Sequence, residues 1–175
     1  AHKDAEADSV FQYLGGFVLE ILACIYKSRQ HSAAMPRLRQ LRIFPNLVGE
    51  LMSLDDGVVL HVVVDKMHAL ENTEFGTRIL HAEFSSALLQ DADASKMAQL
   101  LGVQRVENES FLERHLLPAL CDSTTDPESL VSMLVFLKSR LAYMSGAAAT
   151  RLLETNAGRI VLLTEHGQPV PSGPE

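Results

Sequence analysis

The chain has no tryptophan, few aromatic residues and only two cysteines, and each shortage excludes a class of protein. Aromatic residues make up 6% of the 175 residues, which disfavours a β-sandwich core. Cys24 and Cys121 lie far apart in apolar runs, so they indicate neither a disulfide framework nor a cluster of zinc ligands. We interpret both as reduced core residues, which indicates a reducing compartment.

Basic residues and long apolar runs are also in short supply. The chain has 15 Lys and Arg against 22 Asp and Glu, and its formal net charge is −7. This balance argues against binding to nucleic acid or to an anionic membrane. The most apolar stretch, 15–26, is interrupted by Glu20 and is too short to cross a bilayer. We therefore expect no nucleic-acid partner and no insertion into a membrane.

The two ends of the chain predict its domain organisation and location. Residues 1–9 are acidic, unlike a signal or transit peptide, and we expect a flexible N-terminal segment. Residues 167–175 are rich in Pro and Gly and predict a disordered tail, which leaves 10–166 as one helical domain. We expect an intracellular protein, located in the cytoplasm, or in the mitochondrion if Ala1 follows a cleaved targeting peptide.

The residues that are present favour helices. Ala, Leu and Val carry most of the apolar content, and apolar residues recur at steps of three and four. We expect Gly102 to close one helix and Asp126 to cap another. The valine-rich run at 58–64 also suits a strand, but we predict a helix because residues 65–68 continue the helical pattern. The predicted helices are 10–26, 36–43, 45–53, 57–72, 77–82, 83–90, 93–102, 109–123, 124–144, 147–156 and 157–166.

Part of the sequence occurs twice. The stretch "LENTEFGTRILHAEF" at 70–84 is echoed by "LLETNAGRIVLLTEH" at 152–166, a shift of 82 residues. A second pair, "PRLRQLRIFPNLV" at 36–48 and "TRILHAEFSSALL" at 77–89, is shifted by 41 residues. A common period near 41 residues is typical of stacked helical repeats. An ordinary helix bundle with the same periodicity is the alternative.

Three stretches resemble the armadillo and HEAT-like helical-repeat family: "MPRLRQLRIFPNLVGELMSLDD", "MHALEN" and "STTDPESLVSMLVFLKSRL". They follow the family pattern of a short helix, an apolar-Pro-x-Leu-Val helix and a long third helix. The resemblance implies an all-α, right-handed armadillo-like solenoid of about 8–10 helices. It also implies that the third helices line a groove, with these candidates for binding a partner: His61, Asp65, His68, Asn72, Ser132, Val135 and Ser139.

His61, Asp65 and His68 also raise the question of a metal site, because positions i, i+4 and i+7 share a helix face. On a helix, however, His61 and His68 are about 10 Å apart along the axis. Ligand bonds to one ion are only about 2 Å long. We therefore interpret the three side chains as a polar or partner-facing stripe and expect no metal.

Arg37, Arg39 and Arg42 form a basic cluster that could bind an acidic peptide or a phosphate. The ordinary interpretation of such a cluster is a solubilising surface. No motif of an enzyme is present, and helical spacing points His115 away from Cys121. We therefore expect no catalysis and no cofactor.

These features together predict a non-enzymatic scaffold or adaptor that binds a protein or peptide segment. The alternative is a structural accessory subunit of a large assembly, mitochondrial or cytoskeletal.

Overall fold

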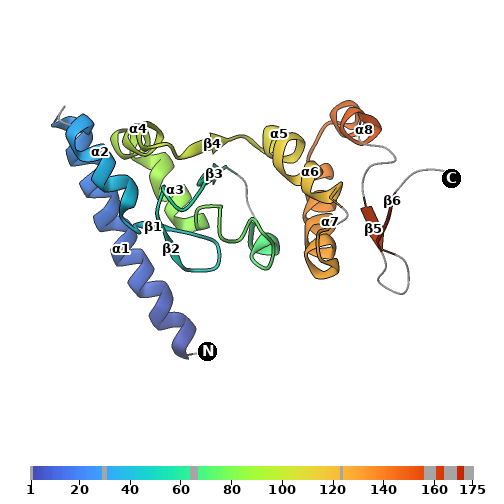
Figure 1. Ribbon diagram of the computed structural model, residues 1–175, viewed down its shortest axis with the longest axis horizontal. Helices are drawn as coiled ribbons and strands as arrows, with labels where there is room; N and C mark the ends of the chain where they lie inside the picture. The colour runs from blue at the N-terminus through green and yellow to red at the C-terminus, as the bar shows by residue number, and fades with distance from the viewer. Residues whose placement is uncertain are drawn as a thin grey trace. The chain divides into compact units, whose positions relative to one another are not determined.

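The computed structural model describes the backbone of residues 2–28, 31–63, 67–122, 124–155, 161–163 and 169–171, and the side chains of 15–28, 32–63, 67–122 and 124–155. The described chain is mostly helical, with a few short strands (Figure 1). It divides into two compact units: unit 1 comprises residues 1–65 and 76–106, and unit 2 comprises 66–75 and 107–175. The single domain predicted over 10–166 is thus shared between two units.

Unit 1 begins with helix α1, His2–Lys27, followed by α2, His31–Gln40. Residues 2–9, predicted to be flexible, are helical and belong to α1, and its first turns extend beyond the other elements of unit 1 in Figure 1. Pro36 lies inside α2 rather than opening it. Five residues before Pro36 are therefore already helical, which the sequence did not predict.

The helix predicted over 45–53 is wrong. Strands β1, Phe44–Pro45, and β2, Leu51–Met52, form a small antiparallel hairpin instead. The turn is closed by Asn46, whose side-chain Oδ1 accepts the N–H of Glu50 at 2.8 Å. Gly49 has a φ of 83°, a left-handed conformation that favours glycine. The Asn and Gly in this segment therefore serve a turn.

The helix predicted over 57–72 is wrong as well. Strand β3, Leu60–Val62, pairs in parallel with β4, Gln104–Val106. Ile79 and Leu80, from the helix predicted at 77–82, form bridges to Leu60 and Asn46 instead. The β-branched residues of the valine-rich run fit this pairing, so propensity outweighs the apparent helical pattern. The long third helix of an armadillo unit is therefore absent from residues 57–63 and 67–72.

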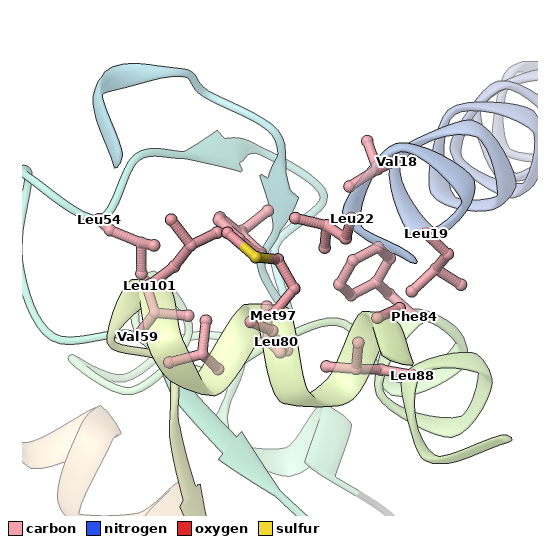
Figure 2. Packing of buried hydrophobic residues seen from close by; sticks show 14 of the residues in the cluster. Val18, Leu19, Leu22, Leu54, Val59, Leu80, Phe84, Leu88, Met97 and Leu101 are labelled. Carbon is pink, nitrogen blue, oxygen red and sulfur yellow. The ribbon is translucent and has the colours of Figure 1, made fainter. Parts of the chain in front are cut away.

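Helices α3, Ala82–Gln90, and α4, Ala92–Leu101, confirm the helices predicted at 83–90 and 93–102. The Asp91 side chain caps α4, which was not predicted, whereas Gly102 ends the helix at a φ of 110°, as predicted. Both helices pack against α1. Figure 2 shows the resulting core, in which α1 side chains meet those of α3, α4 and the strand region; the labelled members are Val18, Leu19, Leu22, Leu54, Val59, Leu80, Phe84, Leu88, Met97 and Leu101.

Unit 2 consists mainly of helical segments. The 3₁₀ helix η1, Met67–Leu70, is followed by a continuous helical stretch made of α5, Asn108–Phe111, π-helical η2, Leu112–Leu116, and α6, Leu117–Leu120. Helix α7, Pro127–Leu141, and helix α8, Gly146–Thr155, come next. These elements confirm the helices predicted near 109–123, 124–144 and 147–156.

Aromatic rings form the centre of unit 2. Phe111 packs edge-on against Phe75 and Phe136, with ring centroids 5.4 and 6.1 Å apart. His115 stacks on the Phe111 ring at 5.8 Å. Edge-to-face pairs at these separations stabilise a core beyond the area that they bury. Three of the chain's aromatic rings therefore pack together where three segments of unit 2 meet.

The last predicted helix is also wrong where the structure describes it. Strand β5, Val161–Leu163, pairs antiparallel with β6, Pro169–Pro171, so this part of the predicted disordered tail is a strand. The two echoed stretches do not share secondary structure: the first contains turns and the start of α3, and the second contains the end of α8 and β5. Gly158 lies outside the described residues. The sequence echo therefore does not mark equivalent structural elements.

Candidate functional site

Helix α7 is fixed at its start by a capping aspartate. The Asp126 side-chain Oδ1 accepts the N–H of Ser129 at 2.9 Å, and Pro127 occupies the first turn. The Ser129 hydroxyl in turn donates to the Asn72 carbonyl at 3.2 Å. Hydrogen bonds from Ser129 are the main cause that lowers the pKa of Asp126 below its usual 3.8. The Asp126 carboxylate therefore sets the start of α7, and the Ser129 hydroxyl links this helix to the turn after η1.

We expect Asp126→Ala to lower the thermal midpoint of unfolding by about 2–4 °C at neutral pH, because the helix loses its cap. Asp126→Asn should keep most of the stability, since Asn also caps helices. The folded pKa is depressed, so the charge stabilises the fold above pH 3.8, and this contribution is lost as pH falls through the lower folded value.

Thermal melts across that pH range measure the midpoint of unfolding of the wild type and of Asp126→Asn. The difference between the two midpoints should become smaller as the pH falls. A difference that stays constant down to about pH 2 would contradict the assignment.

The outer face of α7 is the feature that stands out in unit 2. We use this name for Glu128, Val131, Val135 and Lys138, all of which are exposed. Val131 is 49% and Val135 57% exposed, one helical turn apart, whereas Leu130, Met133 and Leu137 on the inner face are buried. Two neighbouring β-branched apolar side chains thus face solvent between an acidic and a basic residue.

Ser132 and Ser139 are half-buried and lie on the flank of α7 toward Ser129. The Ser139 hydroxyl donates to the Phe136 carbonyl at 2.7 Å and accepts Nε–H of Arg140 at 3.2 Å. Ser132 makes no side-chain hydrogen bond to the residues that the structure describes. Of these two predicted partner-binding serines, Ser132 is therefore the better placed to bond to a partner.

His68 and Asn72, predicted on a helix, lie on η1 and in the turn after it, and both are exposed. Because η1 packs against α7 and Ser129 bonds to Asn72, these residues belong to the same part of unit 2 as Ser132, Val135 and Ser139. The structure therefore brings five of the predicted residues into one unit, although not through the predicted repeat.

His61 does not belong to this surface. It lies in β3 and is 1% exposed, because the segment is a strand whose neighbours Leu60 and Val62 are also buried. The prediction that His61 faces a partner is therefore wrong. Asp65 lies outside the described residues.

The three arginines have different surroundings. Arg39 donates to the carbonyl of Leu101, to the carbonyl of Leu54 at 3.3 Å and to Asp55 Oδ1 at 3.3 Å. Arg42 forms an ion pair with Asp56 at 3.3 Å, and Arg37 is exposed. The prediction of a common basic site is wrong for Arg39, whose guanidinium joins loops of its own unit.

A cavity of about 220 Å³ in unit 1 is lined by the β1–β2 region and the segment 77–78. Arg42 at this cavity faces Asp56, whose pKa is lowered first by the hydrogen bonds of Ser53 and then by Arg42. The Arg42 charge is therefore already neutralised by its own chain, and the cavity is a weaker candidate than the outer face of α7.

The sequence missed several exposed apolar residues. Cys24, predicted in the core, is exposed on α1, and Phe17, two turns before it on the same helix, is 61% exposed. Tyr143 follows α7 and is exposed. The Arg140 guanidinium lies over the Tyr143 ring, 5.5 Å from the ring centroid. Cys121 is half-buried. Helical periodicity identifies apolar faces but does not say which of two faces meets the core.

In the parts of the chain that the structure describes, no three His, Cys, Asp or Glu side chains lie close enough to hold a metal ion together. Across the same residues, no helix has the length and apolar character that crossing a bilayer requires.

Comparison of the chain with protein-family models, with curated proteins and with solved structures found no match.

Proposed function

We propose that this chain is a non-enzymatic interaction module that binds a segment of a partner protein on the outer face of α7. The observation that carries the proposal is the pair of exposed valines, Val131 and Val135, on a helix whose opposite face is fully buried. Helix α7 is anchored by its cap and its core, so the valines are held in place before a partner arrives.

The energetics suit a modest, specific contact. Fully burying one valine side chain is worth about 1.5–3 kcal/mol, and a few such side chains dominate most interfaces. Glu128 and Lys138 lie at opposite ends of the outer face, so a partner with a basic and an acidic residue in matching order is favoured. Ser132, His68 and Asn72 supply polar groups beside the apolar pair.

Stacked armadillo-like repeats stay a proposal for the successive helices α5 to α8 of unit 2. The resemblance of 123–141 to the third helix of an armadillo unit supports that proposal, since the resemblance places Ser132, Val135 and Ser139 on the partner side. The binding role of α7 does not depend on the repeats, because it rests on exposure and anchoring.

The experiment is site-specific photo-crosslinking in cells. A photoreactive residue in place of Val135 should capture a defined protein, and the additional change Val131→Asp should reduce the capture at least about tenfold. Leu153 on α8, which is also exposed and apolar, supplies the control: a photoreactive residue there should not capture the same protein, and Leu153→Asp should leave capture at Val135 intact.

Equal capture from both positions, or none from Val135, would contradict the proposal. Capture of several subunits that purify together as one stable particle would favour the accessory subunit of a large assembly instead.

A further inference from the structure

Helix α1 carries two apolar stripes, and unit 1 covers only one of them. Val18, Leu19 and Leu22 belong to the buried stripe (Figure 2). Phe17 and Cys24 are exposed and Ile21 is half-buried, and these three form the second stripe. An apolar helix face in water is typical of a helix that packs against a further partner.

The spacing of the second stripe indicates that the partner is another helix. Phe17, Ile21 and Cys24 follow one another at steps of four and three, and Leu14 and Val10 continue the same alternation in the sequence of α1. Alternating steps of three and four place side chains along one seam of a two-helix contact. The same seam on a second copy is self-complementary about a two-fold axis.

The charges of α1 decide whether the two helices of such a pair run parallel or antiparallel. Its first turns carry Asp4, Glu6 and Asp8 against one basic residue, Lys3, whereas its last turn carries Lys27. A parallel pair would place the acidic ends of two copies together, and an antiparallel pair places acid against base and also opposes the two helix dipoles. Lys27 forms an ion pair with Asp93 at 3.5 Å, but its side chain stays 67% exposed and can face a second carboxylate.

We propose that a second copy of this chain docks antiparallel on the Phe17, Ile21 and Cys24 stripe of α1, centred near Phe17. One helix face buries less surface than a standard protein–protein interface, so the dimer is reversible. It uses unit 1 alone and is independent of the partner proposed for α7.

The first test measures mass against concentration by analytical ultracentrifugation. The average mass should rise from 19.2 kDa toward twice that value between about 1 and 100 µM. Phe17→Glu should abolish the rise, because it places a charge at the centre of the contact. The matched control is Gly16→Glu, which adds the same charge one position along the helix, where an added Cβ would meet nothing within 4 Å. It should leave the rise unchanged.

Disulfide crosslinking tests the direction, with Cys121→Ser in every variant. In an antiparallel pair centred at Phe17, the two Cys24 residues are about 20 Å apart along the axis, too far for a disulfide. Cys24 should therefore not crosslink, whereas Phe17→Cys combined with Cys24→Ser should give a disulfide-linked dimer.

A disulfide through Cys24 would overturn the antiparallel arrangement. An average mass that stays at that of one chain at every concentration would overturn the dimer. If Phe17 were protected from solvent in that monomer, the stripe would be covered by unit 2 of the same chain and not by a second copy. Circular dichroism of Phe17→Glu checks that α1 remains folded, and the crosslinking results stand even if that variant unfolds.

Discussion

Phe111→Ala is expected to lower the free energy of unfolding by about 3–5 kcal/mol, because it leaves a cavity where one fully buried ring contacts several neighbours. Phe75, His115 and Phe136 all have ring centroids within 6.1 Å of the Phe111 ring. Neighbouring side chains from three segments cannot all move in to fill the space, so the loss should lie at the upper end of the range for core truncations. Urea denaturation followed by circular dichroism measures it.

The control for this variant is Phe17→Ala, studied at low protein concentration so that self-association does not contribute. Phe17 is 61% exposed, and its truncation should change the free energy of unfolding by only about 0.5 kcal/mol. Similar losses for the two variants would mean that Phe111 is not the centre of a packed core. Phe111→Leu should recover a large part of the loss, since it restores most of the buried volume.

Gly102→Ala is expected to cost about 2–3 kcal/mol for two reasons. The residue ends α4 with a φ of 110°, and a left-handed conformation costs a residue with a side chain about 1–2 kcal/mol. An added Cβ would also lie 2.8 Å from Arg39 Nη1. Arg39 would have to give up the bond from Nη1 to the Leu101 carbonyl, which is worth about 1 kcal/mol.

Gly146→Ala is the matched control for Gly102→Ala. An added Cβ at Gly146 meets nothing within 4 Å, and the residue begins a helix, so the change should be neutral or slightly stabilising. A double-mutant cycle with Arg39→Ala separates the two causes. If displacement of Arg39 contributes, the double variant should lose clearly less than the sum of the single losses, and strict additivity would restrict the cost to the backbone of Gly102.

Capped and strongly periodic helices could be predicted from the sequence. Asp126 before Pro127, and Gly102 after a run of apolar steps, mark helix ends through local chemistry that acts within one turn. Helices α4 and α7 follow from such signals. Their existence needed no knowledge of distant residues.

The strands could not be predicted in the same way, because their stability comes from partners far along the chain. Leu60–Val62 pairs with Gln104–Val106, and nothing near either segment identifies the other. The valine-rich run fits a helix or a strand locally, and the pairing decides between them. His61 was misplaced for this reason.

The candidate site was predicted in part. Val135, Ser132 and Ser139 are correctly placed on one helix because α7 is periodic, whereas Val131 was not predicted because it lies outside the armadillo pattern. Arg39 was misjudged since charge alone does not reveal a guanidinium that bonds to backbone carbonyls. Whether Val135 and its neighbours bind a partner stays a prediction.

Residues 66–75 belong to unit 2 and contribute to its core. In the chain they precede residues 76–106, which belong to unit 1. During synthesis, Phe75 therefore leaves the ribosome well before Phe111 and Phe136, its aromatic neighbours. A fragment starting at Glu107 would lack both Phe75 and the turn that Ser129 holds, so truncation there removes part of a hydrophobic core rather than releasing a complete unit.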